Sequence, residues 1–408
     1  MLDISIEQVR ELQSKTGYAP VLSTYKVCLI EDVDRMRTEG IADMKAYSKK
    51  QKGSCYAITL GDMTWDLYWY SRNFVFEQYL ANIKPMLYIP VVHTIGNHDH
   101  DMNATGDWDT VLRFRNDVCP NYYSFNIGKI HYISIDDIEC TNKTASTTDG
   151  DYRTYNEKVV TDVIAWLKKD LAFVDKTTPI VMTSHAPIFK ANLGDNIKNV
   201  SELTAALSGY NVTFVSGHTH VMYNANKSAS LNEYNSGAVC GAWWWAGKYN
   251  DMYNICTDGT PNGYRVIKFN GSKLADNFYK AVGRSADYQF RAYDRNKINL
   301  DLSMVPSAAQ NAFAKELALS LIYGNYSGGS SSNDVIINVW DWNDKWKISV
   351  TENGKALTVS KKTLMDPSFY IAYTVPRLRE NTSVTWHPSY TGHMFVVTAS
   401  SASSTLEI

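Results

Sequence analysis

Four short segments of this chain carry side chains that bind metal ions, and each follows a run of apolar, strand-like residues. They are Gly61-Asp62, Gly96-Asn97-His98-Asp99, Ser184-His185 and Gly217-His218-Thr219-His220. Side chains that follow the strands of an open α/β sheet meet at its carboxyl edge, where such sheets bind their ligands. Carboxylate, amide and imidazole groups form an oxygen and nitrogen ligand set that suits Mn, Fe, Zn or Co. The four segments therefore predict a metal-dependent hydrolase.

The elements that must position these segments are visible in the apolar pattern. We expect strands at 56–60, 89–92, 180–182 and 212–215, directly before the four segments. Helical patterns occupy 32–49, where Asp32 or Asp34 is a candidate N-cap, and also 159–167 and 201–207. Strands that alternate with helices predict a layered α/β domain. Residues 122–135 differ, because they read as an antiparallel hairpin about Gly128-Lys129.

The C-terminal part of the chain has a different pattern. A Gly/Ser-rich loop at 326–333 precedes short β-patterned runs at 335–340, 346–350, 356–359, 370–375 and 394–398. Asn353-Gly354 between two of these runs predicts a two-residue hairpin turn. We find no helical pattern there and predict a small β-sandwich over 291–408, after a catalytic domain over 1–290. His387 and His393 have no carboxylate at metal-like spacing, so we expect surface or packing roles for them.

The residue types indicate how the ligands could divide their work. The Asp62 carboxylate can bridge two cations, and Asn97 offers a neutral carbonyl oxygen. Adjacent side chains at a strand end diverge, so we assign Asn97 to the metal and His98 to the substrate. His218 and His220 stand two apart and share one face of an extended segment. Both can therefore reach one metal cluster.

In this order the four segments resemble the calcineurin-like metallophosphoesterase superfamily. Its blocks read Asp-x-His, Gly-Asp-x-x-Asp, Gly-Asn-His-Asp/Glu, His and Gly-His-x-His, and the resemblance covers roughly residues 20 to 285. It implies a four-layer αββα sandwich with a two-metal centre and a small phosphorylated substrate. Two divalent cations clamp the phosphoryl group and activate a water, so no covalent intermediate is needed.

The resemblance also implies a role for each matching residue. Asp62 would be the bridging ligand, and His98 would protonate the leaving-group oxygen or stabilise the phosphoryl charge. The other ligands fall into two sets: Asn97, His185 and His218 for one metal, and His220 for the other.

Three further segments support a narrower kinship. Residues 237–244, 258–264 and 279–283 resemble a group of Bacteroidota-type multidomain phosphoesterases that carry a C-terminal β-domain. The β-patterned tail fits that module. This resemblance suggests a periplasmic or cell-surface location, although the opening Met1-Leu2-Asp3-Ile4 lacks the pattern of a secretory signal.

The chain departs from the superfamily pattern at two places. The first block should end the first strand, but residues 21–30 contain no carboxylate or histidine. Asp32 follows shortly and could substitute; otherwise the second metal site is weak or empty. In the second block Asp66 stands one residue beyond the usual spacing, so either Asp66 or Asp99 could orient His98. An alternative function follows from the missing block: a degenerate phosphoesterase that binds a phosphate or glycan.

The run Trp243-Trp244-Trp245 has two interpretations. Aromatic side chains mostly contribute burial, which favours core packing. Flat rings also suit a sugar, nucleobase or phenyl group, so Trp243 and Trp244 are candidates for a wall of the substrate cleft.

Composition sets broader limits. With 408 residues and a net charge of −2, the chain has no basic stripe to attract nucleic acid. No apolar stretch approaches the length of a membrane span. The six cysteines are scattered without a Cys-x-x-Cys pair, which predicts buried thiols, with a Cys240–Cys256 disulfide as the alternative in an exported protein. The oligomeric state is not determined by these features.

Overall fold

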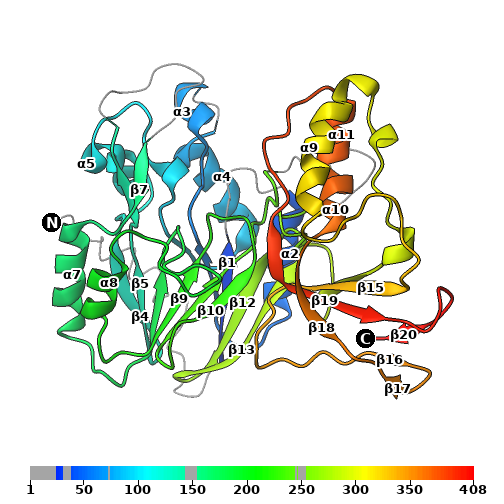
Figure 1. The fold of residues 1–408 in the computed structure, drawn as a ribbon. Helices are drawn as coiled ribbons and strands as arrows, with labels where there is room; N and C mark the ends of the chain where they lie inside the picture. The colour runs from blue at the N-terminus through cyan, green and yellow to red at the C-terminus, as the bar shows by residue number, and fades with distance from the viewer. Residues whose placement is uncertain (1–23, 31–37, 72–73, 143–153, 244–245, 247–253) are drawn as a thin grey trace. The chain divides into compact units, whose positions relative to one another are not determined.

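The computed structural model describes residues 24–30, 38–71, 74–142, 154–243, 246 and 254–408 (Figure 1). Internal contacts divide the chain into two compact units, each made of several segments. The first unit comprises Met1–Thr219, Asn224–Val239 and Gly263–Gly283, and the second comprises His220–Tyr223, Cys240–Asn262 and Arg284–Ile408. That 1–290 and 291–408 form separate domains stays a prediction. Each unit is described by itself.

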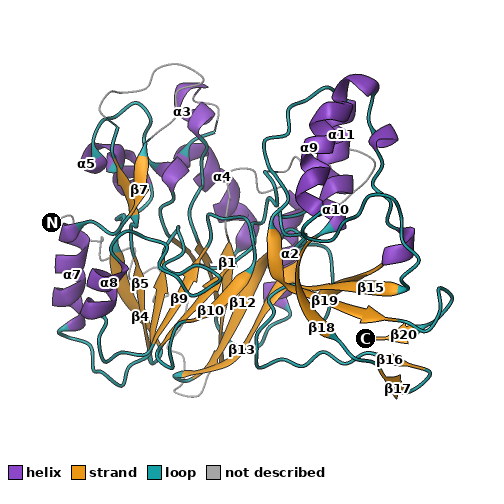
Figure 2. Cartoon of the chain, in the orientation of Figure 1, coloured by secondary structure: helices purple, strands orange, loops and turns teal. Residues whose placement is uncertain are grey.

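The first unit contains two large sheets of mixed strand direction (Figure 2), besides a two-stranded sheet of β6 (Ile138–Cys140) and β7 (Tyr155–Glu157). The five-stranded sheet has the order β13 (Lys273–Ala281), β12 (Gly263–Asn270), β1 (Thr24–Ile30), β2 (Cys55–Thr59) and β3 (Val91–His93). The six-stranded sheet has the order β10 (Tyr223–Asn226), β11 (Leu231–Asn235), β9 (Val212–Ser216), β8 (Ile180–Thr183), β5 (Ile130–Ser134) and β4 (Tyr123–Ile127).

Both sheets contribute one face to a shared core. Because successive side chains of a strand point to opposite faces, every second residue is available to this core. Tyr56 and Ile58 of β2 pack in one cluster with Ile130 and Tyr132 of β5 and with Ile267 of β12. The two sheets therefore form the middle layers of this unit.

Helices cover the opposite face of each sheet. On the five-stranded sheet, Tyr47 of α2 (Thr38–Lys49) packs against Tyr264 of β12, and Tyr79 of α4 (Phe76–Leu87) packs against His93 of β3. On the six-stranded sheet, α7 (Thr161–Leu171) places Asp170 against His131 of β5, and α8 (Val200–Ala206) lies against α7. The predicted four-layer α/β fold is confirmed.

Parallel pairing brings the ends of the key strands to common edges. Strands β1, β2 and β3 are parallel neighbours, and so are β5, β8 and β9. The four strands predicted before the metal-binding segments are present as β2, β3, β8 and β9, which confirms them. The hairpin about Gly128-Lys129 joins β4 to β5 as predicted. Shorter elements fill the loops at these edges: α3 (Asp66–Ser71), η2 (Asn97–Asp99), α5 (Asp107–Thr110), α6 (Leu112–Asp117), β6 (Ile138–Cys140) and β7 (Tyr155–Glu157).

The second unit is rich in strands, as predicted. A four-stranded sheet has the order β14 (Phe290–Asp294), β15 (Asp334–Val339), β19 (Tyr390–Thr398) and β18 (Ser360–Met365). A three-stranded sheet has the order β17 (Lys355–Ala356), β16 (Thr351–Glu352) and β20 (Leu406–Glu407). The predicted Asn353-Gly354 turn joins β16 to β17, with positive φ at both residues. Helical segments accompany the sheets: η3 (Arg295–Lys297), η4 (Leu302–Met304), η5 (Ser307–Ala309), α9 (Gln310–Ser320), α10 (Pro367–Phe369), η6 (Tyr370–Thr374) and α11 (Val375–Arg379).

The prediction that this region contains no helices was wrong. Residues 370–375, expected as a strand, lie in a continuous helical stretch from α10 to α11. Their aromatic and β-branched residues favour strands, but the start signal before them decides otherwise. Asp366 caps the helix by accepting a hydrogen bond from Ser368 N at 2.8 Å, and Pro367 occupies the first turn. The run 346–350, also expected as a strand, is a loop before β16.

Two other expectations concern covalent and membrane features. Cys240 and Cys256 are buried and no disulfide joins them, so the alternative of a disulfide between them is wrong. Cys119 and Cys140 are not part of a disulfide either. Among the helices of the described residues, none has both the length and the apolar character needed to cross a bilayer.

The fold generates a stability prediction at Asp43 of α2. Its carboxylate accepts hydrogen bonds from Tyr264 Oη at 2.7 Å, Lys280 Nζ at 2.8 Å and Gly283 N at 2.9 Å. Replacing Asp43 with alanine removes the carboxylate partner of the nearly buried Lys280 ammonium, so we expect a loss of about 2 kcal/mol or more in unfolding free energy. Urea unfolding measures it. Asp276→Ala, which breaks the exposed pair with Lys268, is the control and should change stability by less than about 1 kcal/mol. Equal effects of the two substitutions would contradict the assignment.

Candidate metal centre

Two glycine turns, at the ends of β2 and β3, lie in direct backbone contact. A Cβ added to Gly61, where φ is +105°, would lie 2.7 Å from Gly96 Cα. A Cβ added to Gly96 would lie 2.3 Å from Asp62 Oδ1 and 2.4 Å from Asp62 N. Real Cβ atoms do not approach other atoms so closely, so both positions require glycine. The contact places the side chains that follow, Asp62 and Asn97, beside each other.

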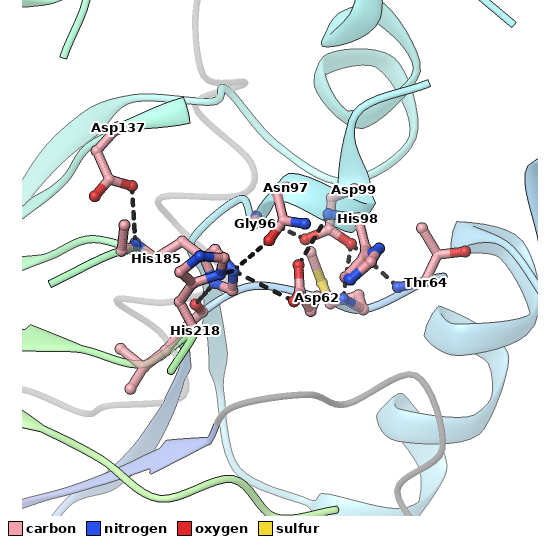
Figure 3. A network of polar contacts seen from close by, with 12 residues as sticks. Asp62, Thr64, Gly96, Asn97, His98, Asp99, Asp137, His185 and His218 are labelled. Atoms are coloured by element: carbon pink, nitrogen blue, oxygen red, sulfur yellow. Dashed lines mark hydrogen bonds and ion pairs between the residues drawn. The ribbon is translucent and has the colours of Figure 1, made fainter. Parts of the chain in front are cut away.

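Four polar side chains, one from each of the four segments, converge in this region (Figure 3). His185 Nε2 lies 2.8 Å from Asn97 Oδ1, 3.3 Å from Asp62 Oδ2 and 3.0 Å from His218 Nδ1. Ligand atoms of Asp62, His185 and His218 all lie within 4.8 Å of one another. The structure therefore brings together four of the five predicted metal ligands.

The protonation of the two histidines follows from what lies behind them. His185 Nδ1 is 2.7 Å from the carbonyl oxygen of Leu60, which can only accept, so Nδ1 carries the proton. His218 Nε2 lies 3.2 Å from the Glu157 carboxylate, which likewise takes its N–H. In their neutral forms both rings then present a lone pair on the nitrogen that faces the cluster. Burial lowers the pKa of His218, which favours that neutral form.

These converging atoms pass a test for a cation site. Hydrogen-bond acceptors converge in one region, with few donors between them. They are two imidazole lone pairs, the Asn97 amide oxygen and the Asp62 carboxylate. Acceptors that face acceptors are favourable only around a positive charge. The donor set of two nitrogens and two oxygens fits a divalent transition metal, and each imidazole has the acceptor behind it that metal-binding histidines use.

Asp62 is held under electrostatic and conformational constraint. Burial alone would raise the pKa of its carboxyl, but His185 and His98 outweigh burial and hold that pKa well below its ordinary value. Asp62 and His218 adopt φ of +57° and +68°, a left-handed conformation rare outside glycine. Strain of this kind is typical of functional sites, because surrounding structure must maintain it.

The two acidic residues that sequence alone left as alternatives have different roles in the structure. Asp66 Oδ1 lies 2.8 Å from His98 Nδ1, so Asp66 is the residue that orients this imidazole. Asp99 instead accepts backbone N–H groups from Met63 at 2.7 Å, Thr64 at 3.1 Å and Gly96 at 2.8 Å. Burial and the neighbouring Asp62 charge raise the pKa of Asp99 to about 7. Asp99 therefore ties the two glycine turns together.

Sequence reasoning missed three residues that support the cluster. Glu157, on the short strand β7, had no local signal at all. Asp137 accepts the backbone N–H of His185 at 3.1 Å and of Ala186 at 3.3 Å, and burial raises its pKa to about 8. It follows strand β5 as the other segments follow theirs, so this position could have indicated it. The buried Trp69 indole donates to the His98 carbonyl at 2.9 Å.

The remaining predicted residues are not part of this cluster as described. His220 belongs to the second unit, where its Nδ1 lies 2.6 Å from the carbonyl oxygen of Gly241. Trp243 also belongs to the second unit and contacts Trp386 edge-on. Asp32 and Trp244 lie outside the described residues.

The glycine contact generates a prediction at Gly96. An added methyl group must displace Asp62, so Gly96→Ala should destabilise the protein by about 1–3 kcal/mol and weaken metal binding. Thermal unfolding and a Mn²⁺ titration measure the two effects. Gly392→Ala is the matched control, because a Cβ there meets nothing within 4 Å. A Gly96→Ala protein with unchanged stability and affinity would contradict the argument.

The partner of His218 generates a second prediction. Glu157→Ala removes the acceptor that fixes the His218 tautomer, so metal affinity should fall about tenfold or more. Glu157→Gln keeps an acceptor oxygen and should fall less. Calorimetric titration with Zn²⁺ or Mn²⁺ measures the affinities. Glu139 lies on β6, the strand that pairs with β7, and forms an ion pair with Lys158. Glu139→Ala is the control and should leave the affinities unchanged. Equal losses in the Glu139 and Glu157 variants would show that Glu157 has no specific role.

Comparison with known structures finds similar chains of low sequence identity. A dimetal phosphatase from Danio rerio is 12% identical, with a TM-score of 0.43 over 64% of this chain and 100% of that one. GAP50, described as the anchor in the inner membrane complex of Plasmodium, is 14% identical, with a TM-score of 0.38 over 64% and 90%. A 5'-nucleotidase from Candida albicans is 12% identical, with a TM-score of 0.39 over 64% and 52%. Similarities of this size say nothing about activity.

Sequence-family comparison is more specific. No curated protein sequence matches this chain significantly. Residues 41–222 match the family model of the calcineurin-like phosphoesterases, and residues 233–408 match the model for the C-terminal part of calcineurin-like phosphoesterases. The predicted kinship is confirmed at this level: the chain carries a calcineurin-like phosphoesterase domain followed by the C-terminal domain of such phosphoesterases.

Proposed function

We propose that this chain hydrolyses a phosphate monoester or diester of a small molecule, with metal-activated water as the nucleophile. One observation carries the proposal: two imidazole lone pairs, an amide oxygen and a carboxylate converge where strands β2, β3, β8 and β9 end. Bound divalent cations would lower the pKa of a coordinated water and stabilise charge on the phosphoryl oxygens. Mn, Fe, Zn and Co all suit the ligand set.

His98 is the residue we assign to the proton transfer. Its Nδ1 faces the Asp66 carboxylate at 2.8 Å, which stabilises a positive charge on the ring. The Trp69 indole holds its carbonyl, and Asp62 Oδ1 accepts its backbone N–H at 3.0 Å. With its backbone held at two points and its ring at Nδ1, His98 can deliver the proton on Nε2 to a leaving-group oxygen without reorganising.

The second metal of the proposed centre would be held by Asp62, by His220 and by a ligand from the first block of the superfamily. Asp62 would bridge both cations, and His220 would be a ligand of the second alone. The ligand that the first block provides has no counterpart in Thr24–Ile30, so another residue must take its place. Ile30, the last residue of β1, pairs with Thr59 of β2, so the chain leaves β1 close to the register at which it leaves β2. In the sequence Asp32 stands two residues after Ile30, and Asp34 stands two residues after Asp32. We propose Asp32 as the missing ligand.

The substrate proposal is coarser. Trp243 and Trp244 are proposed as a wall for a flat leaving group, on the strength of their residue type and place in the sequence. The Bacteroidota-type resemblance, and with it a periplasmic or surface location, is part of the same proposal.

A second candidate function is binding without turnover. It is favoured by one observation: β1 ends without the carboxylate or histidine that the first block requires, since none occurs in Thr24–Ile30. A half-built centre would retain one metal and bind a phosphate or glycan. Unchanged ligand affinity in a His98→Asn variant, together with an absence of hydrolysis in the wild type, would favour this candidate.

The proposed function predicts separate losses in two histidine variants. Wild type should contain bound transition metal and hydrolyse p-nitrophenyl phosphate or its bis-ester. His185→Ala should lose both metal and activity, because it removes the central ligand. His98→Asn should keep its metal and lose about 100-fold to 10,000-fold in kcat, the usual contribution of a general acid. Metal content by plasma mass spectrometry and initial rates measure these effects.

The control is His387→Ala, which removes an exposed histidine paired with Glu316 in the second unit. It should leave metal content and rate unchanged. A wild-type protein that holds no metal and hydrolyses neither ester after Mn²⁺ or Zn²⁺ is added would overturn the proposed function.

A further inference from the structure

His220 is held on several sides by residues of the second unit. Its Nδ1 lies 2.6 Å from the carbonyl oxygen of Gly241, which can only accept a hydrogen bond, so Nδ1 carries the proton. Its ring stacks on Trp386, with centroids 4.7 Å apart and planes at 29°. Its own carbonyl oxygen faces Thr257, whose N and Oγ1 both lie 3.4 Å away. The neutral ring therefore has its lone pair on Nε2, in the form that binds a metal.

Trp386 occupies its place at some cost, which suggests that its ring has a specific use. Its indole Nε1 is buried without a hydrogen-bond partner among the described residues. Buried donors in native structures are nearly always paired, so an orphan requires an explanation. The backbone N–H of Trp386 donates to Tyr373 Oη at 3.0 Å, and Trp243 contacts the indole edge-on at 5.6 Å. These contacts set the plane of the indole against His220 rather than satisfying its N–H.

A second set of contacts fastens the backbone that follows His220. Asp258 Oδ2 accepts the N–H of Met222 at 2.6 Å and lies 3.2 Å from His393 Nε2. Asn338 of β15 donates to the Asp258 carbonyl at 3.0 Å, while its Oδ1 lies 2.8 Å from His393 Nδ1 of β19. The loop that carries Asp258 is thus anchored to the central strands of the four-stranded sheet.

The loop leaves little room for movement. A Cβ added to Gly259, where φ is +85°, would lie 2.1 Å from Asp366 Cγ. Asp366 is fixed in turn by Tyr293 Oη, 2.7 Å from both of its carboxylate oxygens. The residues around His220 are therefore joined to strands and a helix start that lie more than a hundred residues later in the chain.

We propose that the C-terminal domain positions His220, with Trp386 as the residue that sets the plane of its ring and the Asp258 loop as the support of its backbone. This inference rests on the proposed function, in which His220 is a ligand of the second metal. Trp386 is a positioning residue, because it acts only through His220. The strand-rich C-terminal domain is then a working part of the phosphoesterase and not an independent module.

The test replaces the indole without replacing the histidine. Trp386→Leu and Trp386→Met keep an apolar side chain but remove the ring, while Trp386→Phe keeps a ring that can stack. Trp342→Leu is the matched control, since it removes an indole that packs on Phe395 in the same unit. Long-range ¹H–¹⁵N spectra, with His220→Gln to assign the signals, report the ring environment in the metal-free full chain. A Mn²⁺ titration reports the number of metals bound and their affinities.

We expect the Leu and Met variants to shift the His220 ring protons, because the ring current of the indole is lost. The weaker of two Mn²⁺ affinities should fall about tenfold or more, and the Phe variant should recover most of it. The Trp342 control should change neither quantity. Having both a Leu and a Met variant guards against a single failure to fold, which thermal unfolding would reveal.

Two outcomes separate this inference from the function on which it rests. Unchanged His220 signals in the Leu and Met variants would overturn the inference, whether or not the protein binds metal. Shifted signals with unchanged Mn²⁺ affinities in an active enzyme would also overturn it, since the ring would then be held without consequence. A wild-type chain that binds no metal would overturn the proposed function, while the spectra would still decide whether Trp386 positions His220.

Discussion

The contact between the two glycine turns is the constraint on which the candidate metal centre depends. The turns follow neighbouring parallel strands, so their separation is set by the spacing of the sheet. Neither turn tolerates a Cβ, because the backbone of Gly96 lies against Gly61 and Asp62. With this contact made, Asp62 and Asn97 are adjacent, and Asp99 locks the arrangement by accepting three backbone N–H groups. A Cβ at Gly61 would collide with His185 and Gly96, and a Cβ at Gly96 would collide with Asp62.

A second principle recurs at the four histidines predicted for the site, three in the first unit and one in the second: each has one ring nitrogen that faces an acceptor of the protein. His185 faces a carbonyl, His218 the Glu157 carboxylate, His98 the Asp66 carboxylate and His220 another carbonyl. The acceptor behind each ring determines which nitrogen keeps its lone pair. A cation site that would otherwise depend on chance protonation is thereby prepared during folding. Left-handed φ at Asp62, His218 and His220 indicates that the fold sustains some strain to keep these directions.

Much of the first unit could be predicted from the sequence, because its signals are local. The strands before the metal-binding segments and helices α7 and α8 appear where the apolar periodicity indicates them. The structure of the second unit was harder to predict from the sequence. Residues 370–375 have the composition of a strand but form a helix, because Asp366 and Pro367 start one there and the buried side chains pack around it. Residue type indicates a preference for helix or strand. Where neighbouring residues have conflicting preferences, tertiary packing decides which secondary structure forms.

The sequence by itself determined the order and chemical type of the proposed ligands: an aspartate, an amide and three histidines, each in a segment that follows a strand. Only the tertiary structure decided which partners complete them. It selected Asp66 over Asp99 for His98, found Glu157 behind His218, and placed His220 among residues of the C-terminal domain. The reason is physical: a hydrogen bond forms between atoms about 3 Å apart, and that proximity arises from the packing of distant segments. His220 and Trp386 stand far apart in the chain, and no local pattern encodes their contact.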